Sequence, residues 1–222
     1  MIENRPGILL DLDGTLIDSQ PGILASCEAA LRSLGHEPIE PLDIGSVIGP
    51  PIEDVMRYLL LPYGDTRVTE AVEGYRRDYW ERGLKLSELY PAIRAQLSYI
   101  RQRGGRLFLA TSKRTVFAKQ ILANHGLSDE FDGIYGSEPD GLIDHKPELI
   151  RHLLQHEGLT SDRCVMIGDR RFDIAGAHAN NVRAVGVLWG YGSRQELESA
   201  GADRIIEQTS ELADCALTIF NA

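Results

Sequence analysis

The distribution of apolar residues along the chain predicts a buried parallel sheet. Short, largely apolar runs of strand length lie at residues 8–10, 106–110, 164–167 and 184–188, with weaker runs at 131–135 and 202–206. Such runs, without alternating polar positions, are typical of strands that are covered on both faces. Segments of helical length separate the later runs, at residues 92–103, 116–125, 147–157, 172–180 and 194–200. This alternation predicts an α/β fold, in which a Rossmann-like parallel sheet carries helices on both faces.

Residues 18–87 break the alternation. Their apolar positions have a helical period at residues 23–34, 52–61 and 68–84, and turns that contain Gly and Pro separate these stretches. None of them has the pattern of a strand. We therefore predict an all-helical insertion after the first strand, and we call residues 18–87 the cap segment. The predicted domains are an α/β core, residues 1–17 and 88–222, and a small helical cap, residues 18–87.

Composition and charge limit the class of protein. The 222 residues are 43% hydrophobic, and 33 acidic against 23 basic residues give a net charge of −10. General nucleic-acid binding requires a basic surface, so we expect no nucleic-acid partner. The sequence has no recognisable signal peptide and no apolar stretch of about 20 residues, so we expect no membrane partner. Cys27, Cys164 and Cys215 form no paired motif, which favours a reduced, cytoplasmic setting. We expect a monomer or a small homo-oligomer.

Acidic and hydroxyl side chains follow three of the predicted strands, and one lysine precedes the helix predicted at residues 147–157. The carboxyl ends of parallel strands lie at one edge of a sheet, where ligands bind in open α/β folds. We therefore expect these groups to converge on a site made of Asp11, Asp13, Thr111, Ser112, Lys146, Asp169 and Asp173.

This set of side chains suits phosphoryl transfer. Asp11 and Asp169 can hold Mg²⁺, a hard cation that prefers oxygen ligands and offsets the repulsion between the acids. A carboxylate can also act as a nucleophile, and a second one, on Asp13, can donate a proton to the leaving alcohol. The hydroxyl groups of residues 111–112 can bind phosphate oxygens, while Lys146 neutralises their charge.

Each of these motifs also has a purely structural interpretation. The stretch DLDGT suits a tight turn, and Asp169 suits a helix N-cap. We interpret Lys113 as a surface lysine and leave it out of the site. His152 and His156, four residues apart, are interpreted as part of a solvated helix face, because no third zinc ligand lies near them in the sequence.

Four motifs in a fixed order carry a resemblance to a known family. DLDGT, TSK, HKP and GDRRFD resemble the motifs of the haloacid dehalogenase superfamily of phosphohydrolases. The cap segment is similar to the helical cap that one subfamily inserts after its first strand. The chain is most similar to the phosphoglycolate phosphatase-like members, some of which are 5′-nucleotidases. HKPEL departs from the KPxP of many relatives, which puts the shape of that loop in question.

The resemblance implies a role for each residue of the site. Asp11 would be the nucleophile and a metal ligand, and Asp13 the general acid and base, with its backbone carbonyl on the metal. Phosphate would be bound by Thr111, Ser112 and Lys146, and the remaining metal ligands would be Asp169 and Asp173. The cap loop of the family further points to Gly49 and Arg57 as substrate contacts.

The function expected from these observations is Mg²⁺-dependent hydrolysis of a small phosphorylated metabolite through an aspartyl-phosphate. Phosphoglycolate is the first expected substrate and a nucleoside 5′-monophosphate the second. A sugar phosphomutase shares the whole core set of residues and stays an alternative. A non-catalytic phospho-ligand binding protein is a further alternative, although it would ordinarily lack one of the aspartates or the lysine. A dehalogenase has no use for the second aspartate of DLDGT.

Overall fold

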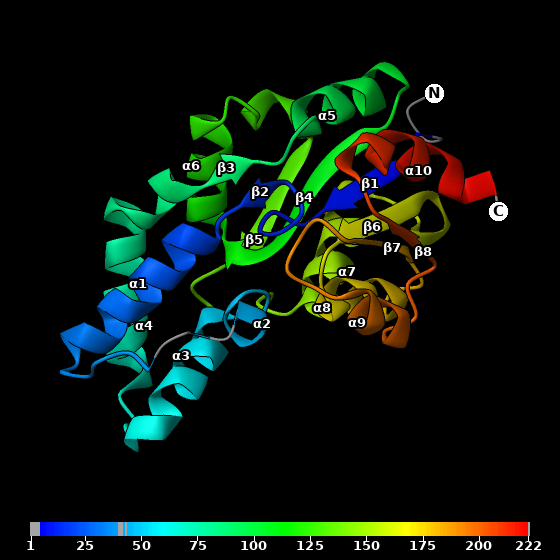
Figure 1. Ribbon diagram of the computed structural model, residues 1–222. Helices are drawn as coiled ribbons and strands as arrows, with labels where there is room; N and C mark the ends of the chain where they lie inside the picture. The colour runs from blue at the N-terminus through cyan, green and yellow to red at the C-terminus, as the bar shows by residue number, and fades with distance from the viewer. Residues whose placement is uncertain (1–4, 40–41, 43, 222) are drawn as a thin grey trace.

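A parallel sheet forms the centre of the protein, whose computed structural model describes residues 5–39, 42 and 44–221 (Figure 1). The sheet has six strands in the order β5-β4-β1-β6-β7-β8. Their bounds are β1 Gly7–Leu10, β4 Arg106–Arg114, β5 Gly133–Ser137, β6 Cys164–Gly168, β7 Arg183–Val187 and β8 Arg204–Ile206. Every pair of neighbours runs parallel. The α/β fold predicted from the apolar runs is confirmed.

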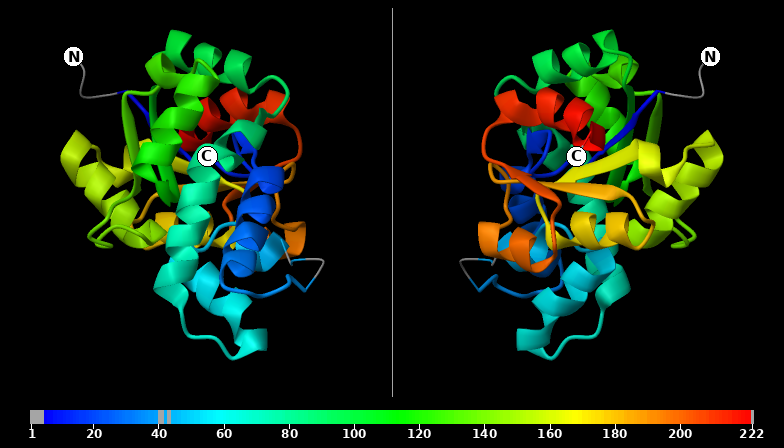
Figure 2. Two further views of the ribbon diagram at one scale, coloured as in Figure 1. Left: turned by 90° about the vertical axis from the view of Figure 1, so that its left-hand side faces the viewer. Right: turned by 90° about the vertical axis from the view of Figure 1, so that its right-hand side faces the viewer.

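Helices cover both faces of this sheet, because side chains that follow one another along a strand point to opposite faces. Ile8 and Leu10 pack into one apolar cluster and Leu9 into another. The first cluster includes side chains of α5 Ile93–Gln102, α6 Thr115–Asn124 and α10 Leu212–Thr218. The second includes side chains of α7 Lys146–Glu157, α8 Arg171–His178 and α9 Arg194–Ser199. The two views of Figure 2 show these helices around the sheet. Of these, only α10 was not predicted.

In its described residues the cap segment contains four helices, which lie to one side of the sheet (Figure 1). They are α1 Gln20–Ser33, α2 Ile44–Val47, α3 Ile52–Leu60 and α4 Val68–Glu81. Pro21 stands in the first turn of α1, where a missing N–H costs nothing. Short 3₁₀ turns, η1 Leu61–Tyr63 and η2 Gly83–Leu86, follow α3 and α4. The short helix α2 was not predicted.

Two very short strands join the cap segment to the rest of the chain. β2 Ile17–Asp18 and β3 Glu88–Leu89 pair antiparallel, with Ile17 opposite Leu89. This ribbon was not predicted, because two residues are too few to show a period. The two ends of the cap segment thus lie side by side, next to the end of β1. We keep the division into core and cap as a proposal.

β4 differs from the strand expected at residues 106–110. It continues to Arg114, and its pairing with β5 shifts register between Ala110 and Arg114. Such an irregularity bends a strand and redirects its side chains. Thr111, Ser112 and Lys113 therefore lie on the strand itself rather than after it. None of the helices in the described part of the chain is long and apolar enough to cross a membrane.

Candidate active site

Three buried aspartates meet where β1 and β6 end. Asp11 follows β1, Asp169 follows β6, and Asp173 lies in the first turn of α8. One carboxylate oxygen from each lies within 4.8 Å of the others. Oδ2 of Asp169 accepts a hydrogen bond of 2.7 Å from the backbone N–H of Tyr191. Its Oδ1 is fully buried and has no hydrogen-bond partner in the described part of the chain. An oxygen ligand of this kind is what a hard divalent cation would use.

Burial and mutual repulsion make this cluster electrostatically unfavourable without a cation. Burial raises the pKa of Asp169 well above its ordinary value, and the charges of Asp173 and Asp11 raise it further. Burial also raises the pKa of Asp173 to about 6, although the Lys146 ammonium opposes that rise. A divalent cation would remove both penalties, and oxygen donors are what hard cations such as Mg²⁺ prefer. The side chains present therefore fit a Mg²⁺ site.

Lys146 joins the aspartate cluster to the end of β4. Its Nζ donates hydrogen bonds of 2.8 Å to Asp11 Oδ1 and 2.7 Å to the carbonyl oxygen of Ala110, and it lies 2.6 Å from Asp173 Oδ1. The side chain is only 4% exposed. Although burial alone would lower its pKa, the charges of Asp11 and Asp173 raise it above the ordinary value. Lys146 is thus a fixed, protonated cation beside Asp11.

Asp13 lies apart from this cluster and has its own partners. Ser19 Oγ donates a hydrogen bond of 2.5 Å to Asp13 Oδ1, and Nζ of Lys113 lies 3.0 Å from Asp13 Oδ2. Asp11 and Asp13 are only two residues apart, yet their carboxylates have different partners and lie in different environments. The Lys113 side chain is only 6% exposed, so its interpretation as a surface lysine is wrong.

Thr111 and Ser112 lie at the same edge of the sheet. Thr111 is buried, and its Oγ1 accepts a hydrogen bond of 3.2 Å from the backbone N–H of Lys113. Both residues line a pocket that also contains Asp11 and Asp13. The structure therefore brings together all seven core residues that the sequence suggested, with Asp13 facing the pocket rather than the aspartate cluster.

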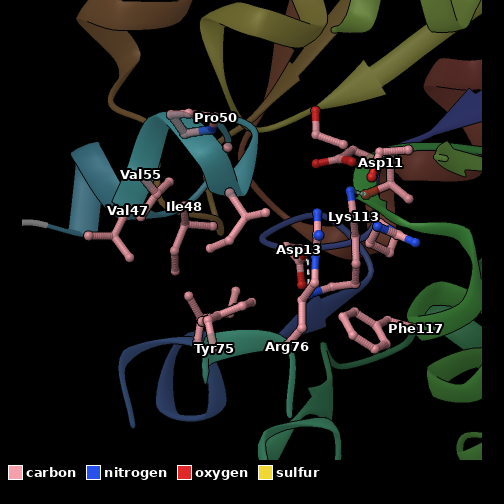
Figure 3. Close-up of a pocket in the computed structure, with 17 residues that line it drawn as sticks. Asp11, Asp13, Val47, Ile48, Pro50, Val55, Tyr75, Arg76, Lys113 and Phe117 are labelled. Atoms are coloured by element: carbon pink, nitrogen blue, oxygen red, sulfur yellow. Dashed lines mark hydrogen bonds and ion pairs between the residues drawn. The ribbon is translucent and has the colours of Figure 1, made fainter. Parts of the chain in front are cut away.

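The opposite side of this pocket is largely apolar and comes from the cap segment. In Figure 3, Val47, Ile48 and Val55 lie across from Asp11 and Lys113. All the apolar side chains that line the pocket belong to the cap segment except Phe117 on α6, and the full set is Ile23, Val47, Ile48, Pro50, Ile52, Val55, Tyr75 and Phe117. The pocket thus has a polar end at the sheet and an apolar wall in the cap segment.

Of the two cap residues suggested by the sequence, Gly49 lines the pocket and Arg57 does not. Arg57 is 61% exposed and pairs with Asp54 at 2.6 Å. The arginine of the cap segment that lines the pocket is Arg76 on α4, which pairs with Glu53 at 2.6 Å. No pattern in the sequence distinguished these two arginines, because both stand on helices of the cap segment.

An arginine from outside the cap segment holds the turn around Gly49. Arg170, from GDRRFD, is 3% exposed and donates to the carbonyl oxygens of Gly45, at 2.7 Å, and of Ile48. Its guanidinium also pairs with Glu196 at 2.9 Å. Gly49 has φ +115°, and a Cβ there would lie 3.2 Å from the Arg170 guanidinium. Arg170 therefore connects the end of β6 to the part of the cap segment that lines the pocket.

Sequence reasoning missed the loop after β7, Trp189 to Gly192. The backbone of Tyr191 binds Asp169, and its hydroxyl accepts a hydrogen bond from the backbone N–H of Ser19 and donates one to Asp18. Trp189 Nε1 donates to the carbonyl oxygen of Thr15 at 3.0 Å. The signal was present: an aromatic, glycine-rich stretch follows a fourth apolar run, at the edge where ligands bind.

Close packing at the site depends on Gly14. This residue has φ +80°, and a Cβ there would collide with the carboxylate of Asp169 and the ring of Tyr191. Glycine adopts this backbone conformation at no steric cost. The glycine of DLDGT is therefore required both by the turn and by the approach of β6 to β1.

Comparison with known proteins agrees with this geometry. Residues 8–187 match a family described as haloacid dehalogenase-like hydrolase. A 5′-nucleotidase from Pseudomonas aeruginosa is 42% identical over 87% of both chains. A phosphoglycolate phosphatase from Neisseria gonorrhoeae is 31% identical, over 95% of this chain and 93% of its own. A crystal structure described as a predicted phosphatase from Clostridium acetobutylicum superposes with a TM-score of 0.88 at 36% identity, covering 96% of this chain and 98% of that one.

Proposed function

Since the chain belongs to the haloacid dehalogenase-like hydrolase family, we propose that this phosphatase is Mg²⁺-dependent and acts on a small phosphomonoester through an aspartyl-phosphate on Asp11. The observation that carries the proposal is the division of the DLD pair. The carboxylate of Asp11 lies in the aspartate cluster beside Lys146, and that of Asp13 lies beside Lys113 and Ser19. Two carboxylates in different surroundings suit two different roles.

In the first step, a carboxylate oxygen of Asp11 attacks phosphorus, and the bond from phosphorus to the alcohol oxygen breaks. Asp13, in its protonated form, gives its proton to that oxygen, and the alcohol leaves. In the second step, water attacks the aspartyl-phosphate while Asp13 takes a proton from the water. Phosphate is released, and Asp11 and Asp13 return to their starting forms.

Asp11, Asp169 and Asp173 would hold the cation, with the backbone carbonyl of Asp13 completing the protein's share. Bound there, Mg²⁺ neutralises charge on the phosphate oxygens and on the attacking carboxylate. The unpartnered oxygen of Asp169 supports this assignment. Lys146 keeps Asp11 oriented and adds a second positive charge.

Phosphate recognition is assigned to residues of β4 and the start of α7. Thr111 and Ser112 line the pocket together with Asp11, and Lys146, at the start of α7, donates a hydrogen bond to Asp11. Hydroxyl groups, backbone N–H groups and an ammonium recognise the phosphoryl group alone. Selection of the remainder of the substrate therefore belongs to the cap segment.

The apolar wall makes nucleoside 5′-monophosphates the stronger candidates for that remainder. Phosphoglycolate, the first choice from the sequence, offers a carboxylate and almost no apolar surface. Arg76 could pair with it only in part, because Nη2 is already paired with Glu53 and the buried Nε is the donor without a partner in the described part of the chain. A nucleobase can instead pack against the side chains of Tyr75, Ile48 and Val55. The 5′-nucleotidase named above supports the same choice.

The test is phosphate release from a panel of phosphomonoesters, assayed in Mg²⁺ and in EDTA. The panel contains nucleoside monophosphates, phosphoglycolate, sugar phosphates and p-nitrophenyl phosphate. We expect Mg²⁺-dependent release with nucleoside monophosphates preferred, and a loss of at least about 10³-fold in kcat for Asp11→Asn. Full turnover by Asp11→Asn would refute the nucleophile. Conversion of a sugar phosphate to its isomer without phosphate release would identify a mutase, and Mg²⁺ binding without any turnover a binding protein.

A further inference from the structure

Lys113, the lysine of the TSK motif, was interpreted from the sequence as a surface residue, but it contacts two residues at the site. Its Nζ lies 3.0 Å from Asp13 Oδ2 and 2.8 Å from the hydroxyl oxygen of Tyr79. It also lies 4.3 Å from the centre of the Tyr79 ring. The side chain is almost completely buried. A lysine held so closely on two sides has a defined position rather than the freedom of a surface side chain.

Both oxygens of the Asp13 carboxylate are held by these neighbours. Ser19 Oγ binds Oδ1, and Lys113 Nζ binds Oδ2. Ser19 is itself buried, immediately before α1. Because Asp13 lies outside the aspartate cluster, these two contacts fix the direction of the carboxylate in the pocket. Both hydrogen bonds go to a carboxylate, and of the two donors only Lys113 brings a positive charge of its own.

The second partner of Lys113 comes from the cap segment. Tyr79 lies on α4 and is fully buried. Its ring stacks on Tyr75, which lines the pocket, with centres 5.3 Å apart, and it packs against Phe117 of α6. A Cβ on Gly83 would collide with the Tyr79 ring, so a glycine at residue 83 makes room for it. The contact of Lys113 with Tyr79 therefore joins β4 to α4.

We propose that Lys113 is a positioning residue, which holds the Asp13 carboxylate in the orientation needed for acid and base catalysis and links that orientation to α4 through Tyr79. This proposal rests on the phosphatase mechanism given above. When α4 is packed against α6, the hydroxyl of Tyr79 fixes Nζ of Lys113, and Nζ in turn fixes Asp13. One helix then positions both the pocket wall and the acid, because Tyr75 and Tyr79 lie on successive turns of α4.

The competing role for Lys113 is direct binding of the substrate's phosphate, and the leaving group distinguishes the two. An alkyl alcohol needs a proton as it departs, whereas p-nitrophenolate departs without one. Loss of phosphate binding lowers kcat/KM for both kinds of substrate equally. Loss of a correctly placed acid lowers kcat/KM for the alkyl phosphate alone, since this quantity covers only the steps up to release of the alcohol.

The experiment therefore compares kcat/KM for a nucleoside monophosphate and for p-nitrophenyl phosphate. We expect Lys113→Met to lower kcat/KM for the nucleoside monophosphate at least about tenfold more than kcat/KM for p-nitrophenyl phosphate. The ratio of these two values is the quantity compared between variants. Tyr79→Phe keeps the ring and removes the hydroxyl, and we expect a shift of about threefold in the same direction. Lys119→Met is the matched control, because Lys119 is exposed on α6, and the ratio should not change.

A second measurement uses the Asp13→Asn background, where no acid is left to position. There Lys113→Met should change the ratio by less than about twofold. Equal losses for both substrates, no loss, or a full shift in the Asp13→Asn background would each overturn the proposal while leaving the phosphatase in place. A wild-type protein that hydrolyses neither substrate would overturn the proposed function itself. If Lys113→Met fails to fold, Tyr79→Phe and Lys113→Arg carry the same comparison.

Discussion

At the scale of single residues, the site is a set of charges that oppose folding unless something neutralises them. Asp169 is the clearest case, since it is fully buried with one unpartnered oxygen and two neighbouring carboxylates. Lys146 offsets part of this charge but contacts Asp11 and Asp173, and no contact with Asp169 is present in the described part of the chain. The proposed cation site would explain the position of Asp169, which stability alone does not explain.

Asp169→Asn should stabilise the metal-free protein and abolish its response to Mg²⁺. The substitution keeps the shape of the side chain and removes the charge that burial and its neighbours make unfavourable. In EDTA at pH 8 we expect the melting temperature to rise by a few degrees. Phosphatase activity should fall at least about 100-fold. Thermal unfolding in EDTA and in Mg²⁺ measures the melting temperature and its response to the cation, and phosphate release measures the activity.

The control is Asp129→Asn, at an exposed position in the turn η3 Ser128–Glu130. This variant should match the wild type in melting temperature and in its response to Mg²⁺. A lower melting temperature for Asp169→Asn than for the wild type in EDTA would show that the carboxylate is satisfied by the protein alone. The metal assignment would then lose its main physical support.

At the scale of secondary-structure elements, the helices and strands that could be predicted are those whose local sequence is enough to indicate them. β1 and β6 are buried along their whole length, so their apolar runs predicted them. The helices α5 and α7 end shortly before a glycine, Gly104 and Gly158 respectively, and glycine commonly follows the C-terminus of a helix. Their bounds were therefore predicted to within about one residue.

Three features that could not be predicted from the sequence depend on contacts between distant parts of the chain. The ribbon of β2 and β3 has two residues on each side and exists only because residues 17 and 89 meet. The burial of Lys113 depends on Tyr79, which is 34 residues away in the sequence. The choice of Arg76 over Arg57 depends on which face of each cap helix meets the pocket. Local patterns carry no information about such pairings.

Arg170 links two elements, and its removal should loosen the turn that carries residues 47–50. Arg170→Met deletes the ion pair with Glu196 and leaves the carbonyl oxygens of Gly45 and Ile48 without this donor. Because Glu196 keeps 18% exposure, we expect a loss of about 2 kcal/mol in the free energy of unfolding rather than the full cost of breaking a buried pair. KM for the preferred substrate should rise about tenfold, with a smaller effect on kcat.

Urea unfolding and steady-state kinetics measure the two effects, and the neighbouring arginine supplies the control. Arg171 is 56% exposed and lies 3.9 Å from Glu196. Arg171→Met should change stability by less than about 0.5 kcal/mol and leave KM unaltered. If Arg170→Met loses stability but keeps its KM, the cap turn does not depend on this arginine.

At the scale of the whole molecule, the strand order explains why the site forms where it does. β1 lies between β4 and β6, with Gly7 in register with Arg106 on one side and Cys164 on the other. The chain passes first to one side of β1 and later to the other, which opens a crevice at the carboxyl end of β1. DLDGT occupies that position, and the cap segment enters and leaves the core beside it.

The acidic cluster should also make the stability of the whole protein depend on pH and Mg²⁺ together. Burial raises the pKa of Asp173 from its ordinary value of 3.8 to about 6, and it raises that of Asp169 as well. Both groups therefore bind protons more tightly in the folded protein than in the unfolded chain. The contribution of these two carboxyl groups to the free energy of unfolding therefore falls as pH rises from about 4 through their raised pKa values. Bound Mg²⁺ offsets the loss, and at low pH protons compete with it.

We therefore expect saturating Mg²⁺ to raise the melting temperature by several degrees at pH 8 and by much less at pH 5. Thermal unfolding at both pH values, in Mg²⁺ and in EDTA, measures the four melting temperatures. Asp169→Asn removes one ligand and one raised pKa, so the Mg²⁺ increment should nearly vanish for it at either pH. Equal increments for the wild type at pH 5 and pH 8 would mean that the cation does not compete with protons for these carboxylates. The aspartate cluster would then not be the cation site, and the proposed mechanism would need another one.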